Sequence, residues 1–286
     1  MGKTNAQRNV EFNILDNGRT HFPNWLYTRN NTINKFIFGP ALNAAYSIAN
    51  QATNIINQFS SSFQTAINPQ ITKNYATKQY KEMNKLIYRS SKLSYFLMLI
   101  LAVPLFYEAN FLLKIWLGNI PEHSVSFMKL GIFIAMLTAV RNPLVTAAIA
   151  NGHLKKYQLV VNGILIMVAP LLYIVFKLGA IVEWANIILL IAMFFAVLAS
   201  AFMLQEMVFL DFKTFIKEVI YKIITVTFLS FIVPFFLYIN MEEGWQRLII
   251  LGIFSTFTTI CIIYYIGLTP QEGKFIKDNI IKKIYK

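Results

Sequence analysis

The stretch WANIILLIAMFFAVLASAFMLQ, residues Trp184–Gln205, contains no Lys, Arg, Asp or Glu. A helix needs about 20 mostly apolar residues to cross the roughly 30 Å hydrocarbon core of a bilayer, so this stretch is predicted to span a membrane. Six further stretches are long and carry few or no charges: 36–72, 93–113, 125–150, 157–176, 223–241 and 248–271. The sequence therefore predicts about seven membrane-spanning helices.

The composition agrees with a polytopic membrane protein. Of the 286 residues, 56% are hydrophobic and 14% are charged, and the mean hydropathy is +0.52, whereas soluble domains average about 25% charged residues. These values exclude a disordered chain, a coiled coil and a secreted disulfide scaffold. A single cysteine, Cys261, and three histidines argue against an internal disulfide or a metal cluster. The predicted spans indicate an all-α protein. Because the sequence has no Gly-rich phosphate loop, we expect no cofactor.

Lys and Arg concentrate in alternate connections between the predicted helices. They are numerous in 73–92, 151–156, 211–222 and 269–286, whereas 117–124 and 178–186 have none and 240–247 has two Glu against one Arg. Because cytoplasmic connections of membrane proteins are enriched in Lys and Arg, the C-terminus is predicted to be cytoplasmic. Attraction to anionic lipid headgroups accounts for the net charge of +13 without a nucleic-acid partner.

The same pattern divides the chain into three segments. Residues 36–270 are predicted to form the transmembrane bundle and residues 271–286 a basic cytoplasmic tail. Residues 1–35 are polar and contain no span, although seven spans with a cytoplasmic C-terminus put their basic residues on the outside. We expect this segment to be extramembrane or a non-native start that replaces a preceding span.

The stretch FIFGPALNAAYSIANQATNIINQFSSSFQTAINPQIT, residues 36–72, is uncharged but rich in amides. Pro40 suits a helix first turn and Asn68-Pro69 suits a break, so a helix is expected between them. Its polar residues recur at steps of three and four, which places them in one line along the helix: Asn43, Ser47, Asn50, Asn54, Asn57, Ser61, Gln64 and Asn68. Three more polar residues widen this line on one side: Gln51, Gln58 and Thr65. The opposite face is apolar.

An unpaired amide is costly in hydrocarbon, so this polar line must face other helices or water. Amides can hydrogen-bond across packed helices, which is the first interpretation. The second is a hydrated central cavity, where uncharged amides and hydroxyls would offer donors and acceptors to a sugar. On the second interpretation the candidate binding residues are Asn43, Asn50, Asn54, Asn57, Ser61 and Gln64.

Arg141 lies within the apolar run 130–150, beside Asn142-Pro143. A charge at such a position usually faces a cavity or a partner. The planar guanidinium could hold a phosphate or pyrophosphate. The alternative is a structural pair with a carboxylate elsewhere.

No catalytic constellation can be assembled from the sequence, so we do not expect an enzyme. All carboxylates fall in connections or near the ends of spans, which argues against a cation-coupled drug exporter, since such a protein usually needs a buried carboxylate. A membrane acyl- or glycosyltransferase acting on a lipid-linked sugar is the enzymatic alternative. It would need an essential acid or base at an interface, and His123 with Glu122 is the nearest such pair.

Several motifs resemble Wzx-type polysaccharide and O-antigen flippases of the multidrug/oligosaccharidyl-lipid/polysaccharide exporter superfamily. The most specific are FGPALNAA (Phe38–Ala45), NQF (Asn57–Phe59) and FQTAINPQITK (Phe63–Lys73). Four others give support: Leu86–Lys92, Ile115–Gly118, Gly152–Gln158 and Phe215–Val219. The resemblance covers residues 36–286.

The resemblance implies the C-terminal bundle of a 12–14-helix flippase in the bacterial cytoplasmic membrane, with a cavity between two bundles. Its implied partners are an undecaprenyl-pyrophosphate-linked oligosaccharide, membrane lipids, and polysaccharide polymerase or export machinery. The sugar would contact the polar line, and Arg141 would hold the pyrophosphate. A drug exporter of the same fold is one alternative. An inactive fragment is another, because the N-terminal bundle of the family has no counterpart here.

Overall fold

The computed structural model describes residues 22–270, 272 and 273, and the side chains from residue 42 onward. This part of the chain is helical and has no strand. The elements, in chain order, are α2 (Phe22–Ala76), α3 (Tyr80–Tyr107), α4 (Ala109–Leu117), α5 (Ser124–Asn151), α6 (Leu154–Ile166), α7 (Val168–Lys177), α8 (Trp184–Val208), α9 (Phe212–Phe215), η1 (Ile216–Ile220), α10 (Tyr221–Asn240), α11 (Trp245–Ile262) and η2 (Ile263–Gly267). The predicted all-α polytopic architecture is confirmed.

Six helices are long and apolar enough to cross a membrane. They cover Tyr80–Tyr107, Ser124–Asn151, Leu154–Lys177, Trp184–Val208, Phe212–Asn240 and Trp245–Gly267. The seventh predicted span is also a helix, α2. Its many amides make it too polar to be among the six described helices that could cross a membrane. The protein is therefore a multi-pass membrane protein with one additional, amphipathic long helix.

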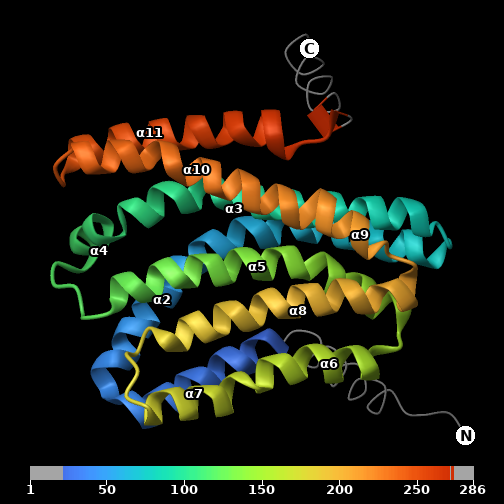
Figure 1. Cartoon of the computed structure of the whole chain (residues 1–286), viewed down its shortest axis with the longest axis horizontal. Coiled ribbons are helices and arrows are strands. Elements are labelled where there is room, and N and C mark those ends of the chain that lie inside the picture. The colour runs from blue at the N-terminus through green and yellow to red at the C-terminus, as the bar shows by residue number, and fades with distance from the viewer. Residues whose placement is uncertain (1–21, 271, 274–286) are drawn as a thin grey trace, which may run out of the picture.

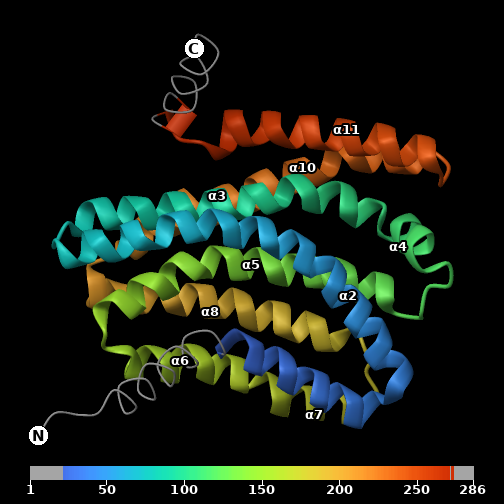
Figure 2. The ribbon, with the colours of Figure 1, turned by 180° about the vertical axis from the view of Figure 1, so that it is seen from behind.

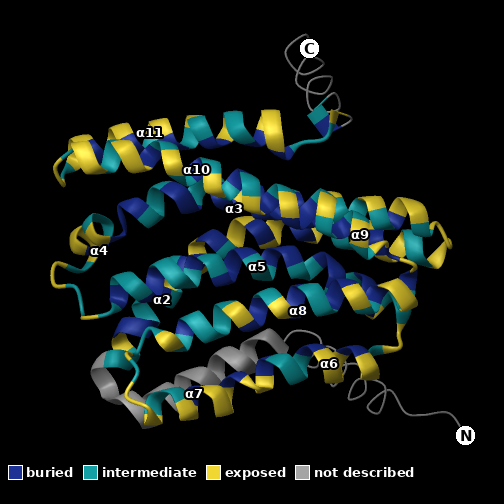
Figure 3. Cartoon of the chain, viewed as in Figure 1, coloured by how far each residue is buried: buried dark blue, intermediate teal, exposed yellow. Residues whose placement is uncertain are grey.

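The helices form an elongated bundle whose core lies between α2, α3 and α5. α8 packs against α5, the α6–α7 pair packs against α8, and the α10–α11 pair packs against α3 on the other side (Figure 1). Figure 2 shows α2 running across α5 and beside α3 on the opposite face. α3 and α5 are the central spans, since 61% and 56% of their most apolar stretches are buried, against 17% for α11. The exposed apolar residues of α6, α7 and α11 form the outer surface (Figure 3), as expected for contact with lipid.

The predicted boundaries of the amide-rich helix are wrong at both ends. Pro40 lies well inside α2, which begins at Phe22, and the helix continues past Asn68-Pro69 to Ala76. A proline removes only one backbone donor, and Ile71, just beyond the expected break, is fully buried in the core. Packing of this last turn therefore outweighs the local preference for a break. Residues 22–35 of the predicted N-terminal segment belong to this helix, and of the predicted tail only residues 272 and 273 are described.

One predicted span is divided by its proline. α6 ends at Ile166 and α7 begins at Val168. Pro170 has no N–H to donate to the Ile166 carbonyl, and its ring would clash with that carbonyl in a regular helix. Pro104, Pro143 and Pro234, by contrast, lie inside helices that continue through them.

Candidate functional site

The described part of α2 presents three faces rather than the two that were predicted. The buried face, packed on α3 and α5, repeats every three or four residues from Ala45 to Gln64 and returns two turns later at Ile71: Ala45, Ala49, Thr53, Ile56, Ser60, Gln64 and Ile71. A second face is exposed and polar without charge, and consists of Gln51, Asn54, Gln58, Ser61, Ser62 and Thr65. We call this second face the amide surface. On the third face Ile55 and Phe59 are 66% and 57% exposed.

The amide surface has polar groups that are free of contacts with the described bundle. The hydroxyls of Ser61 and Ser62 both donate to the Gln58 carbonyl, and that of Thr65 donates to the Ser61 carbonyl. These bonds satisfy the hydroxyl donors within the helix. The side-chain amides of Asn54 and Gln58 make no hydrogen bond to the described residues, so they remain able to bind a polar ligand or a partner.

Gln64 is the one predicted binding residue that is buried, and its amide connects three helices. Its Oε1 accepts a hydrogen bond of 2.7 Å from Asn142 Nδ2 on α5. Its Nε2 lies 2.9 Å from the Ala139 carbonyl of α5 and 3.3 Å from Ser94 Oγ of α3, and it also contacts Ser60. For this residue the structure supports the interhelical interpretation.

The other predicted residues of the polar line lie at different depths. Asn54 and Ser61 are exposed, while Asn43, Asn50 and Asn57 are half-buried. Asn50 borders a small cavity of about 10 Å³ between α2, α5 and α8, which Thr53 and the buried Asn186 also line. This volume is about that of one water-sized probe and the lining is partly polar, so the cavity suits a single water and is too small for a sugar.

Arg141 is half-buried on α5, and its Nε has no hydrogen-bond partner among the described residues. Its guanidinium lies within interaction range of the Tyr157 hydroxyl at the start of α6. That hydroxyl donates in turn to Ser200 Oγ on α8, at 3.0 Å. The next residue, Asn142, contacts α2 through Gln64. Consecutive residues of a helix point about 100° apart. Arg141 therefore faces α6, whereas Asn142 faces α2 and its polar line.

The structure contains two buried carboxylates that were not expected from the sequence. Glu108, at the junction of α3 and α4, is fully buried and forms a two-pronged pair with Arg247 of α11, at 2.8 Å and 3.1 Å. Glu272 is also buried, and its carboxylate lies 2.7 Å from Lys92 Nζ. Each is paired with a buried cation, so neither is a free carboxylate that could exchange a coupling ion. In the sequence, each of these carboxylates lies near the same predicted membrane surface as its cation, which could have suggested an ion pair. The burial of the pair could not be deduced from residue spacing.

The residue pair that the transferase alternative needs has a different arrangement. His123 Nδ1 lies 2.5 Å from Glu183 Oε1, and its Nε2 lies 3.7 Å from Glu122 Oε1. His123 precedes α5 and Glu183 precedes α8, so the closer contact ties two connections together. Within the residues described, no group of three or more His, Cys, Asp or Glu could hold a metal ion.

The two ends of the bundle differ in charge. Hydrogen bonds between helix ends join Asn151 to Tyr75 and Met207, and Asn84 to Phe209, at the end that carries the basic connections. The His123–Glu183 pair joins the starts of α5 and α8, and the Glu108–Arg247 pair joins the α3–α4 junction to the start of α11. These helix ends lie at the other end of the bundle (Figure 1). The basic and non-basic connections therefore gather at opposite ends, as a membrane orientation requires.

The amide-rich helix and the spans that pack on it are the part of the chain with a known family signature. Residues 33–174 match the MatE family. The match covers just under half of the chain and extends from α2 into α7. It supports the multidrug/oligosaccharidyl-lipid/polysaccharide exporter superfamily, and MatE proteins are membrane transporters rather than enzymes. Neither the curated proteins nor the solved structures contain a match to the chain.

Proposed function

We propose that the protein takes part in moving a lipid-linked oligosaccharide, with an undecaprenyl-pyrophosphate carrier, across the bacterial cytoplasmic membrane. The observation that carries this proposal is the amide surface of α2. It combines exposed amides and hydroxyls with a complete lack of charge, on a helix whose other side packs into a membrane-spanning bundle. The MatE match supports transport as the general activity.

The chemistry of the amide surface favours a carbohydrate over an ion or a hydrocarbon. The amides of Asn54 and Gln58 each offer donors and an acceptor, which can pair with sugar hydroxyls. Facing lipid, the same groups would lack partners at a considerable free-energy cost. In the proposed mechanism the sugar passes along this surface while the lipid carrier stays in the bilayer. The C-terminus is cytoplasmic, and a rocking motion of the helices exposes the amide surface first to one side and then to the other.

Arg141 remains our candidate for holding the pyrophosphate, because its Nε is unpartnered and a guanidinium matches phosphate geometry. We expect Arg141→Ala to abolish transport and Arg141→Lys, which keeps the charge but loses the planar fork, to retain a part of it. The measurement is the flipping rate at matched protein levels. Full transport by Arg141→Ala would remove Arg141 from the mechanism.

The direct test uses the full chain reconstituted in liposomes with a fluorescent oligosaccharide on a polyprenyl-pyrophosphate carrier. The appearance of the sugar on the opposite leaflet is followed by its accessibility to an added lectin. We expect the double substitution Asn54→Leu and Gln58→Leu to reduce the rate at least about tenfold. Gln158→Leu, which changes an exposed amide on α6, is the matched control and should keep the wild-type rate. Equal rates for all three proteins, or no transport by the wild type, would contradict the proposal.

A drug exporter of the same fold is the second candidate, and the MatE match supports it equally. The paired state of Glu108 and Glu272 argues against it, because within the described residues each buried carboxylate already has a cation. A fluorescent cationic dye in the same liposomes separates the two functions. Dye transport that survives the Asn54 and Gln58 substitutions would favour the drug exporter.

A further inference from the structure

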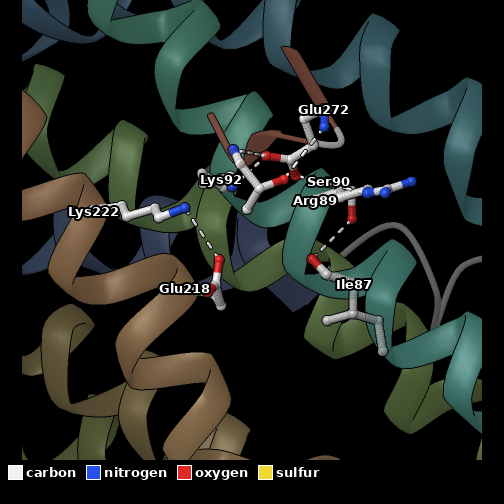
Figure 4. A network of polar contacts seen from close by, with 8 residues as sticks. Ile87, Arg89, Ser90, Lys92, Glu218, Lys222 and Glu272 are labelled. Carbon is white, nitrogen blue, oxygen red and sulfur yellow. Dashed lines mark hydrogen bonds and ion pairs between the residues drawn. The ribbon is translucent and has the colours of Figure 1, made fainter. Parts of the chain in front are cut away.

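A buried lysine at the basic end of the bundle receives its counter-charge from the segment that follows the last span. The Lys92 side chain, on α3, is only 2% exposed, and its Nζ lies 2.7 Å from Glu272 Oε2 (Figure 4). Arg89, one turn earlier on α3, lies 3.7 Å from the other oxygen of the same carboxylate and is 46% exposed. One anion is thus held between a buried cation and a cation that reaches the surface.

The Glu272 carboxylate is also supported by its own segment. The Thr269 backbone N–H donates to Glu272 Oε2 at 2.8 Å, and the Glu272 N–H lies 3.4 Å from Thr269 Oγ1. This reciprocal arrangement is a capping box at a helix start. Burial alone would raise the pKa of the Glu272 carboxyl, but the hydrogen bonds with Lys92 and Thr269 outweigh it and hold that pKa below its usual value. Glu272 is therefore an anion at neutral pH.

The other charged residues nearby do not replace Glu272 as the partner of Lys92. Lys222 Nζ lies 3.2 Å from Glu218 Oε2, and this pair belongs to the η1–α10 region (Figure 4). Without Glu272, the buried Lys92 ammonium would keep only the weaker attraction of Glu218, a carboxylate already paired with Lys222, which is unfavourable for a buried charge. The Lys92 position consequently requires an anion, and its own chain provides one from a short segment beyond η2.

We propose that Lys92 and Arg89 form a binding site for a phosphate group, and that Glu272 occupies this site as an internal substitute. Both side chains are strong phosphate ligands, since they form charge-assisted hydrogen bonds to its oxygens. The site lies at the end of the bundle that carries the basic connections, where anionic headgroups concentrate beside a cytoplasmic membrane surface. A phosphate that binds there displaces the Glu272 carboxylate from Lys92 and Arg89.

The test uses the purified full chain in a neutral detergent and measures bound probe by native mass spectrometry. One arm adds inorganic phosphate and the other adds phosphatidylglycerol, with diacylglycerol as the phosphate-free control. Binding in the first arm alone identifies a free-phosphate site, and binding in the second alone identifies a headgroup site. Either result supports a site for phosphate.

The variants separate this site from general attraction to a basic protein. Glu272→Gln removes the internal anion and should raise the probe affinity at least about tenfold over the wild type. Lys92→Gln combined with Glu272→Gln should abolish the gain. Glu82→Gln, which removes an exposed carboxylate paired with Lys85 on the same helix, is the matched control and should bind as the wild type does.

Two further outcomes keep the test decisive if Glu272→Gln is unstable. Recovery of folded protein only when phosphatidylglycerol or phosphate is added would support the site, because the probe would then supply the missing anion. Loss of folding with or without the probe overturns the proposal. So does an unchanged affinity in Glu272→Gln, or a gain that persists when Lys92 is also replaced.

Discussion

At the scale of single residues, α2 shows how position decides the role of one amide type. Gln58 and Gln64 are six positions apart, which places them about 120° from one another around the helix. Gln58 is exposed, whereas Gln64 is buried and contacts α3 and α5. Both residues belong to the polar pattern visible in the sequence, but only the packing assigns one to helix association and leaves the other free.

We predict that Gln64→Leu lowers the free energy of unfolding by about 1–3 kcal/mol, because Asn142 Nδ2 and the Ala139 carbonyl lose a buried partner. The change is measured by reversible unfolding in mixed micelles. Gln58→Leu makes the same substitution on the exposed face and should change stability by less than about 0.5 kcal/mol. Equal effects at the two positions would show that burial does not distinguish them.

The sequence predicted much of this site at the level of residue type and little of it at the level of contacts. The three- and four-residue steps identified a polar line on one helix, and Gln51, Gln58 and Thr65 were recognised on its flank. The three flanking residues are exposed together with Asn54 and Ser61 of the line, whereas other members of the line are half-buried and Gln64 is buried. The sequence pattern of α2 does not show how this helix is rotated about its own axis relative to α3 and α5. That rotation is set by the packing of Ala49, Thr53 and Ile56.

At the scale of elements, α2 and α5 pack closely at a point where a glycine meets a threonine. A Cβ placed on Gly131 would lie 3.0 Å from Thr53 Cγ2. Small residues at such crossings allow two helices to pack closely within a membrane. The position of α2, and with it the direction of the amide surface, depends on this contact.

We predict that Gly131→Val destabilises the bundle by about 1–3 kcal/mol, because the added side chain overlaps Thr53. Gly163 on α6 has open space around the corresponding position, so Gly163→Val should cost no more than about 1 kcal/mol. Unfolding in detergent measures both. The prediction fails if the two valines are equally tolerated.

The Glu108–Arg247 pair joins α11 to the α3–α4 junction. Arg247 also lies over the Tyr238 ring, 4.7 Å from its centroid, so the guanidinium is held on two sides. Breaking a buried ion pair by removing one partner leaves the other charge without compensation. The placement of α11, whose span is only 17% buried, therefore depends on this contact.

We expect Arg247→Met to lower the unfolding free energy by about 3–5 kcal/mol, because the Glu108 carboxyl stays buried without its partner. The double variant Glu108→Gln and Arg247→Met should recover a large part of this loss. Hydrogen exchange along α11 reports whether the effect is local to that helix. A double variant no more stable than Arg247→Met would argue against charge burial as the cause.

At the scale of the whole molecule, the alternation of basic connections was the most reliable sequence signal. It requires only that consecutive spans cross in opposite directions, and the bundle brings the basic connections to one end. The extension of α2 beyond Pro69 was not predicted correctly, because it depends on local competition between proline and packing. Charge pattern and hydropathy thus predicted the architecture, whereas element boundaries required the structure.

The orientation of the molecule can be tested at one exposed residue from each end. In a Cys261→Ser background, His153→Cys lies in a basic connection and Asn119→Cys in a connection without Lys or Arg. Because Lys and Arg are retained on the cytoplasmic side, an impermeant maleimide added to intact bacterial spheroplasts should label Asn119→Cys at once. His153→Cys should react only after permeabilisation, which also provides the control for reactivity. The reverse pattern would place the C-terminus outside, and labelling of both sites in intact cells would mean that the two ends do not lie on opposite sides of a membrane.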